Sequence, residues 1–365
     1  MLKETRIAVD QATLDRIHRR VSDAAIGYAP DDDADWSYGV DARWLNDLRD
    51  FWRDAYDWRT AEEAFNAVPQ VRGTIDGIDI HAFRFPAEGG KGYPLLLTHG
   101  WPGSPLEFMA AARLLAAQGF EVIVPSLPGY AFSGRPPRPI PPSRVAELWR
   151  LLMEGLGHQR FGAQGGDWGS AVTRYLSVDH AGVVDAIHLN MMHVGRPPNP
   201  SPDYEPWRKR VAEIQSREGA YAHVHGTTPQ TIGLALADTP IGFAAWVIEK
   251  CRAWSDCGGD VESVFSKWDL VTNAMTHLVS GNVQGGIWMY HGRGSEPFAP
   301  APICVPTGFA EFPAEFVPAP PRADVEQTVN IVRWTKMPKG GHFPAWEQPE
   351  LFAEEVGSFF SANVR

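Results

Sequence analysis

Cysteine is scarce in this sequence, and its spacing excludes two common roles. The chain has 365 residues and three cysteines, Cys251, Cys257 and Cys304. An odd number of cysteines without C-x-x-C spacing indicates neither a disulfide framework nor a zinc site. The first twenty residues carry charges throughout and contain no apolar segment of the kind found in secretory signals. Both observations predict a cytoplasmic protein.

Positive charge and long apolar runs are also lacking. The formal net charge is -11, whereas nucleic acids and anionic membrane surfaces bind proteins through basic patches. No segment approaches the ~18 consecutive apolar residues that a membrane-spanning helix needs. We therefore expect neither nucleic acid nor a membrane as a partner, and we leave a homodimer open as the assembly.

No sequence pattern points to a metal or a cofactor. The one dense acidic run, Asp31–Asp33, is followed by no His or Glu at ligand spacing. A solvated loop therefore explains the run better than a metal site does. We expect the protein to act without a metal or a cofactor.

Strands that alternate with helices predict the α/β fold class, with a mostly parallel central sheet. Apolar residues at helical spacing predict helices before residue 70, and the dipeptide Asp76-Gly77 predicts a hairpin turn. Strands are expected at 93–100, 120–130, 183–192, 301–309 and 328–337. Ser143 is expected to cap a helix that runs to about Gly157.

The pattern changes to helices and loops between residues 196 and 300. A helical block between the strands of a sheet predicts a cap over an active site. We therefore expect four segments: an N-terminal extension over 1–90, the first part of an α/β core over 91–195, a helical cap over 196–300, and the second part of the core over 301–365.

Three glycine-containing turns follow predicted strands. They are HGWPGS at 99–104, GGDWGS at 165–170 and GGHFPAWEQPE at 340–350. Open α/β sheets bind their ligands beyond the carboxyl ends of the strands, where these turns lie. In this order the three turns predict an α/β-hydrolase fold, with the nucleophile in the second turn and a histidine in the third.

The nucleophile position holds Asp167, where many hydrolases have serine. An aspartate that attacks the carbon of an epoxide forms an ester, which water can cleave, whereas a serine would form a stable ether. A carboxylate with a reference pKa of ~3.9 also needs no deprotonation before it attacks. We therefore predict an alkylating substrate. The alternative interpretation is that Asp167 only caps the following helix.

His342 is predicted to activate water for the second step, as a general base oriented by a buried acid. The backbone N–H groups of Trp101 and Trp168 are expected to stabilise the oxyanion of the tetrahedral intermediate. A core histidine without a catalytic role is the alternative for His342. Spacing alone leaves four acids: Glu311, Glu315, Asp324 and Glu326. Six other histidines are expected to be structural or at the surface: His81, His158, His188, His223, His225 and His277.

These motifs resemble those of the microsomal-type epoxide hydrolases, a family that includes the juvenile-hormone epoxide hydrolases. The segment 51–85 is similar to the N-terminal extension of that family, and HGWPGS and GGDWGS are similar to its two turn motifs. VPTGFAEFPAEF at 305–316 resembles the segment of the catalytic acid, which implies Glu315. The segments 217–254 and 280–290 resemble those that hold two epoxide-binding tyrosines, which implies Tyr221 and Tyr290. Two phenols can stabilise the alkoxide as the ring opens.

The resemblance implies an enzyme that hydrolyses an epoxide to a vicinal diol through a covalent ester. Animal members usually begin with a membrane-anchoring helix that this chain lacks, which implies a soluble bacterial form. Bacterial relatives act in natural-product pathways such as those of the enediynes, and the 14 tryptophans favour a bulky, apolar epoxide. One alternative is a haloalkane dehalogenase of the same fold, in which asparagine often replaces Trp101. The other is a non-catalytic ligand-binding relative.

Overall fold

The computed structural model describes residues 2–33, 36–192, 195–296 and 302–364. Within them nine strands form one sheet, in the order β1-β2-β3-β5-β4-β6-β7-β8-β9. From β5 to β9 all neighbouring strands are parallel, and the strands on the other side of β5 are antiparallel. The predicted α/β class with a mostly parallel sheet is confirmed. The strands are β1 (Lys3–Glu4), β2 (Gln70–Ile75), β3 (Ile78–Phe85), β4 (Tyr93–Thr98), β5 (Phe120–Pro125), β6 (Phe161–Gly165), β7 (Val184–Leu189), β8 (Ile303–Glu311) and β9 (Val329–Lys336).

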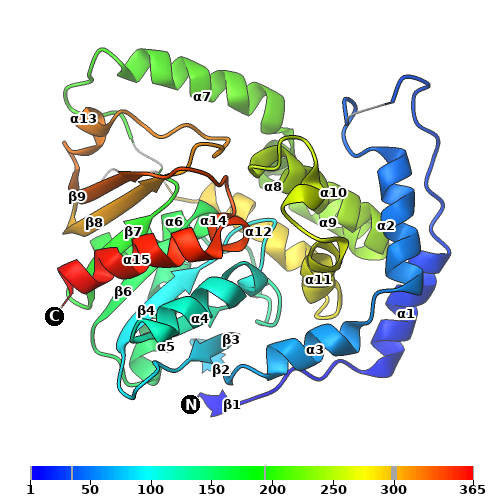
Figure 1. Cartoon of the computed structure of the whole chain (residues 1–365), viewed down its shortest axis with the longest axis horizontal. Helices are drawn as coiled ribbons and strands as arrows, with labels where there is room; N and C mark the ends of the chain where they lie inside the picture. Colours follow the sequence, from blue (N-terminus) through cyan, green and yellow to red (C-terminus); the bar gives the residue numbers. More distant parts are fainter. Residues whose placement is uncertain (1, 34–35, 193–194, 297–301, 365) are drawn as a thin grey trace.

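Helices cover both faces of the sheet (Figure 1). Helices α4 (Met109–Ala117) and α15 (Pro349–Asn363) pack against each other over one face, and α5 (Pro142–Gly155) and α6 (Asp167–Asp179) pack against each other over the other. The central strands therefore have no solvent-facing side. In β4 the consecutive residues Leu95, Leu96 and Leu97 are fully buried, which explains its unbroken apolar sequence.

The predicted hairpin at Asp76-Gly77 is confirmed. It joins β2 and β3, with Ile75 paired to Ile78 across the turn. Asp76 and Gly77 both have positive φ, 44° and 83°. Two-residue turns of this kind match the twist of antiparallel strands, and aspartate followed by glycine adopts that backbone most readily.

Among the described residues, six helices lie between β7 and β8 and form a cap beyond the carboxyl ends of the parallel strands (Figure 1). The helical block predicted there is thus present. The boundary predicted between residues 300 and 301 lies outside the described residues. The helices are α7 (Tyr204–Glu218), α8 (Ala220–Thr227), α9 (Pro229–Asp238), α10 (Pro240–Trp254), α11 (Lys267–Leu278) and α12 (Val283–Arg293), with a short 3-10 turn, η2 (Val261–Ser263), before α11.

The N-terminal helices are α1 (Gln11–Ser22), α2 (Ala42–Asp54) and α3 (Trp58–Asn66). Each begins with an aspartate whose carboxylate accepts hydrogen bonds from the first turn, a favoured N-cap. They lie along the outside of the cap (Figure 1). The Trp44 indole N–H donates to Glu262 at 2.7 Å, and the Tyr56 hydroxyl lies 3.2 Å from that of Thr272.

The prediction that Ser143 caps a helix is wrong. Helix α5 begins one residue earlier at Pro142, with Pro141 at the N-cap position. Proline suits the first helical position because its φ is already helical and its missing N–H would have no partner there. The Ser143 hydroxyl instead donates to the Glu296 carboxylate.

No single helix in the described part of the chain is long and apolar enough to cross a membrane. Helices α9 and α10 meet that criterion only when taken as a pair, and they are bent by 116° where they join.

Two of the remaining short helices, η1 and α14, adjoin the turns at the carboxyl ends of the strands. A 3-10 turn, η1 (Pro105–Phe108), follows the HGWPGS segment and leads into α4. Helix α14 (Pro344–Glu347) follows the GGHF segment, and α13 (Arg322–Val325) precedes β9. The three motif turns therefore lie together at the carboxyl ends of the strands, beneath the cap.

Candidate active site

Asp167 lies in a tight turn between β6 and α6. It is the first residue of the helix, yet its φ is +46°, in a region that non-glycine residues rarely adopt. The close packing of the turn requires the flanking glycines: a Cβ on Gly169 would lie 1.9 Å from the Thr98 carbonyl oxygen, and one on Gly165 would lie 2.2 Å from Gly169. This is the geometry of a nucleophile elbow, which exposes the side chain at the end of the strand.

The interpretation of Asp167 as a helix cap is wrong. Gly166 occupies the N-cap position, and no side-chain capping bond is formed within the described residues. One carboxylate oxygen, Oδ1, instead accepts a hydrogen bond of 2.8 Å from the backbone N–H of Trp101. The first N–H groups of α6, beginning at Trp168, also lack intrahelical acceptors, as at any helix start. Of the two expected oxyanion donors, Trp101 therefore contacts the Asp167 carboxylate, and Trp168 follows Asp167 directly in the chain.

His342 follows β9 and reaches the same carboxylate. Its Nε2 lies 3.6 Å from Asp167 Oδ2, and its Nδ1–H donates to both oxygens of Glu315, at 2.9 and 3.0 Å. Burial opposes a charge on the imidazole. The nearby carboxylates of Glu315 and Asp167 outweigh burial and hold the pKa of His342 well above its usual value.

The structure brings only one of the four acids considered into contact with His342. Glu315 lies in the loop after β8 and is 7% exposed. The other three bond elsewhere: Glu311 accepts from Trp334, Asp324 accepts from Ser201, and Glu326 pairs with Arg322.

Glu347, on α14, fixes the loop that carries His342. Its carboxylate accepts hydrogen bonds of 2.8 to 2.9 Å from the backbone N–H groups of Asp256, Gly341 and Phe343. Burial raises the pKa of Glu347 to about 6, although these three bonds favour the charged form. No sequence pattern singles out this residue, because its partners are backbone groups from two separate loops.

Tyr221 on α8 and Tyr290 on α12 face Asp167 from the cap. Tyr221 stacks on Trp101 with ring centroids 4.7 Å apart and an interplanar angle of 11°. Tyr290 packs edge-on against Trp168 at 4.7 Å, and the two tyrosine rings are 5.7 Å apart. Burial, reinforced by the negative charge of Asp167, raises the pKa of both phenols, so both are protonated at neutral pH and can donate hydrogen bonds.

His225 packs behind the two tyrosines. Its ring meets those of Trp101 and Tyr290 edge-on, each at 4.9 Å, and its Nε2 accepts a hydrogen bond of 3.1 Å from the Trp246 indole. Burial lowers the pKa of His225 to about 3, so the imidazole is neutral. The expected structural role of His225 agrees with this position, but its contact with the tyrosines could not be predicted from the sequence.

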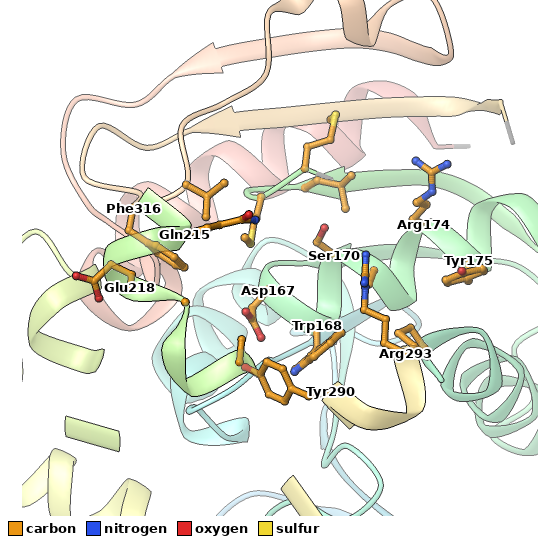
Figure 2. Close-up of a pocket in the computed structure, with 18 of the residues that line it drawn as sticks. Asp167, Trp168, Ser170, Arg174, Tyr175, Gln215, Glu218, Tyr290, Arg293 and Phe316 are labelled. Atoms are coloured by element: carbon orange, nitrogen blue, oxygen red, sulfur yellow. The ribbon is translucent and has the colours of Figure 1, made fainter. Parts of the chain in front are cut away.

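A pocket of about 470 Å³ opens onto Asp167 between the core and the cap. Figure 2 shows the Asp167 carboxylate pointing into it near Trp168 and Tyr290, with Arg174 and Arg293 at a distance on one side and Phe316 on the other. Many lining side chains are apolar: Ala171, Leu189, Met191, Met192, Ile303 and Phe316. Among the described residues, no three His, Cys, Asp or Glu side chains are grouped to hold a metal ion.

Fold and site together define an α/β-hydrolase with an aspartate at the nucleophile elbow. Comparisons with known proteins agree. Residues 2–108 match the family model described as "Epoxide hydrolase N terminus", and residues 93–220 match the model of the alpha/beta hydrolase fold.

Similar proteins cover nearly the whole chain. Epoxide hydrolase 1 of Oryctolagus cuniculus is 30% identical over 98% of this chain and 88% of its own length. Juvenile hormone epoxide hydrolase 2 of Ctenocephalides felis is also 30% identical, over 98% of this chain and 85% of its own. The solved structure of Aspergillus niger epoxide hydrolase has a TM-score of 0.90 and 29% identity, covering 100% of this chain and 97% of the other. The chain belongs to the epoxide hydrolase family, which confirms the resemblance that the motifs predicted.

Proposed function

We propose that this enzyme hydrolyses an epoxide to a vicinal diol through an ester on Asp167. The observation that carries the proposal is the position of the Asp167 carboxylate, which faces two protonated phenols across the pocket and a buried histidine behind it. A carboxylate attacks carbon without prior deprotonation, and the ester that it forms can be cleaved by water.

In the first step, Asp167 Oδ2 attacks an epoxide carbon. Oδ1 already accepts the hydrogen bond from Trp101, which favours Oδ2 as the attacking atom. As the carbon–oxygen bond of the ring breaks, Tyr221 and Tyr290 hydrogen-bond the leaving oxygen, and one phenol proton moves to it. A donor in place before charge develops stabilises a transition state more than water does. The product of this step is a hydroxyalkyl ester and a phenolate.

In the ester Asp167 carries no charge and no longer raises the pKa of His342, so the imidazole gives its proton through solvent to the phenolate. In the second step, the neutral His342 Nε2 takes a proton from water, and the hydroxide attacks the carbonyl carbon of the ester. Glu315 holds the imidazole through Nδ1 and stabilises its positive charge. The N–H groups of Trp101 and Trp168 stabilise the oxyanion. As the tetrahedral intermediate collapses, the alkyl oxygen leaves and takes the proton that remained on the attacking oxygen, which releases the diol and restores the carboxylate. His342 keeps the proton from water, as in the resting site.

The pocket favours a bulky, apolar epoxide. Its volume of about 470 Å³ lies within the range of sites for drug-sized ligands. The apolar side chains around Asp167 suit a hydrocarbon body, and a role in natural-product biosynthesis, such as that of enediynes, fits a substrate of this size. We also propose the division into an extension (1–90), a two-part core (91–195 and 301–365) and a cap (196–300), and a cytoplasmic location.

The decisive test uses the variant His342→Gln with styrene oxide. We expect the ester to form and persist, so that the intact mass of the protein rises by the mass of one epoxide. Wild-type enzyme should release the diol and show no lasting adduct. Normal turnover by the His342 variant would contradict the mechanism.

The products released by the wild-type enzyme separate this function from that of a haloalkane dehalogenase. A dehalogenase releases chloride from chloroalkanes and has no need of phenols that face the substrate oxygen. We expect diol from epoxides and no chloride from 1-chlorobutane. Chloride release without diol formation would favour the dehalogenase, and failure to modify Asp167 with either reagent would favour a non-catalytic protein.

A further inference from the structure

A second, much smaller cavity lies on the other side of Asp167. Its volume is about 10 Å³, close to the room that one water molecule needs. His342, Glu107 and Thr98 line it, but they do not line the large pocket, and Tyr221 and Tyr290 line the large pocket alone. Within the described residues, Asp167 is the one residue shared by both. The two spaces therefore meet at the nucleophile.

Three buried polar atoms around this cavity have no hydrogen-bond partner among the described residues. They are Thr98 Oγ1, Glu107 Oε1 and His342 Nε2. Thr98 is fully buried, His342 is 4% exposed and Glu107 is 8% exposed. An unpaired polar atom in a protein interior is costly, so three of them around a single small space indicate a ligand that can pair with all three.

Glu107 belongs to η1 and reaches the cavity across Gly103. A Cβ at Gly103 would lie 1.3 Å from Glu107 Oε1, so glycine at this position makes room for the carboxyl group. Burial raises the pKa of Glu107 to about 8, with the charge of Asp167 adding to the shift and His342 opposing it. The carboxyl group is thus protonated at neutral pH and can donate a hydrogen bond as well as accept one.

We infer that this cavity holds the water that hydrolyses the Asp167 ester, and that Glu107 and Thr98 bind this water beside His342. The inference rests on the two-step mechanism proposed above. A water molecule has two hydrogens and two lone pairs. One O–H donates to His342 Nε2 and the other to Thr98 Oγ1, while the Glu107 O–H donates to one lone pair. The remaining lone pair attacks the carbonyl carbon of the ester.

Both protons of the water are used in this step. His342 Nε2 receives one of them, the new carbon–oxygen bond forms, the bond between the ester carbon and the alkyl oxygen breaks, and the alkyl oxygen takes the second proton. Glu107 keeps its own proton throughout. It therefore holds and orients the nucleophile and does not act as the base.

The test is a rapid-quench experiment with styrene oxide on the full chain, measuring the rate of ester formation and the rate of ester hydrolysis separately. Glu107→Leu removes the hydrogen bond while roughly keeping the side-chain volume. We expect ester formation to be unchanged and ester hydrolysis to slow by roughly 100-fold, the cost of a misplaced reactant. The ester should therefore accumulate. Hydrolysis at the wild-type rate, or an equal loss in both steps, would overturn the inference.

Two further variants keep the test decisive if Glu107→Leu does not fold. Glu107→Gln is neutral and retains a donor, so hydrolysis should stay near the wild-type rate and should no longer change with pH around 8. Thr98→Val removes one acceptor with little change of shape and should slow hydrolysis alone. If Thr98→Val leaves hydrolysis unchanged and Glu107→Gln keeps the pH dependence, the inference is wrong.

A matched control shows whether the effect of the Glu107 variants comes from the water site or would follow from the loss of any buried carboxylate. Glu355 is 5% exposed and bonds Arg333 and Thr335, away from both cavities. Glu355→Gln should leave both rates unchanged. The His342→Gln variant distinguishes the two proposals: if it forms no ester, the proposed mechanism fails, whereas if it traps the ester and Glu107→Leu does not, only the assignment of the water site fails.

Discussion

The two oxygens of the Asp167 carboxylate have different neighbours, which gives each of them a different role in the proposed mechanism. Oδ1 accepts the N–H of Trp101, and Oδ2 lies 3.6 Å from Nε2 of His342, the proposed base. Asp167→Asn keeps an oxygen for the Trp101 bond but replaces the attacking atom with an amide nitrogen, a poor nucleophile. We expect turnover to fall by at least about 10⁴-fold, as for the removal of other catalytic nucleophiles.

The steady-state rate of diol formation measures this loss. Because the amide has nearly the shape of the carboxylate, the melting temperature should change little and serves as the folding control. A variant that forms diol at the wild-type rate would exclude Asp167 as the nucleophile.

Tyr221 and Tyr290 should act on ring opening alone. Each phenol is one donor to the leaving oxygen, and the loss of one such donor typically costs about 10²–10³-fold in rate. We expect Tyr221→Phe and Tyr290→Phe each to slow ester formation by that factor, measured by rapid quench, with ester hydrolysis unchanged. Because Tyr221 stacks on Trp101, phenylalanine preserves the packing. A loss confined to the hydrolysis step would contradict these roles.

The raised pKa of Glu107 also predicts how the stability of the folded protein changes with pH. The folded state raises the pKa from 4.5 to about 8, so between these values the folded chain binds more protons than the unfolded chain. The contribution of Glu107 to stability is therefore complete below about pH 4.5 and is lost as the pH rises towards 8. The groups that act on Glu107 electrostatically are His342, Asp167 and Glu347, and it acts in turn on Cys251.

Glu107→Gln cannot titrate. The difference in unfolding free energy between wild type and this variant, measured in urea, should shift in favour of the variant from pH 5 to pH 8. A difference that stays constant over this range would show that Glu107 is not protonated in the folded protein.

At the scale of elements, short helices and turns hold the site. Helix α14 has only four residues, yet Glu347 on it ties down the loop on either side of His342. In Glu347→Gln the amide nitrogen faces backbone donors that it cannot pair with. We expect a loss of about 1–3 kcal/mol in the free energy of unfolding, the cost of buried groups left unpaired.

Ester hydrolysis should slow in the same variant, because the imidazole is less firmly placed. Glu350→Gln, at an exposed carboxylate in the next helix, is the matched control and should change neither quantity. Unchanged stability of Glu347→Gln in urea unfolding would mean that the three backbone bonds do not fix the loop.

The elements also show what the sequence could predict. Helix α2 was predictable because Leu45, Leu48 and Trp52 recur at helical spacing and are all buried. The start of α5 was not, because proline and serine both favour helix starts and the sequence alone did not show that Ser143 bonds the distant Glu296.

In the site, the positions of Asp167 and His342 could be predicted from the sequence, because the glycines beside them indicate sharp turns at strand ends. The choice of Glu315 among four acids rested on the resemblance, since all four lie within a few residues of β8 or β9. Glu107 was not predictable at all. Its burial and its missing partner depend on how η1 folds over Gly103, which no local pattern encodes.

At the scale of the whole molecule, the N-terminal helices and the cap support each other. Helix α2 contacts both α10 and α11, and its Leu48 is fully buried. Leu48→Ala should lower the free energy of unfolding by about 2–5 kcal/mol, as for other large-to-small changes in a core. Unfolding in urea, followed by tryptophan fluorescence and by activity, measures the effect.

Since the extension braces the cap, the two signals should be lost together in this variant. Leu234→Ala is the control, because Leu234 is 54% exposed on α9 and its truncation should cost little. Activity lost well before fluorescence would show that the cap separates from the extension without unfolding the rest.

The position of the cap between β7 and β8 also sets the order in which the parts of the site are synthesised. As the chain leaves the ribosome, the aspartate emerges first, then the whole cap, and only afterwards the acid and the base. A partly made chain holds the group that would capture an epoxide but not the groups that would release it. On the proposed mechanism, the phenols that promote capture lie on the cap, and the acid and the base follow β8 and β9, so a molecule can turn over only after the segment that holds His342 has been made.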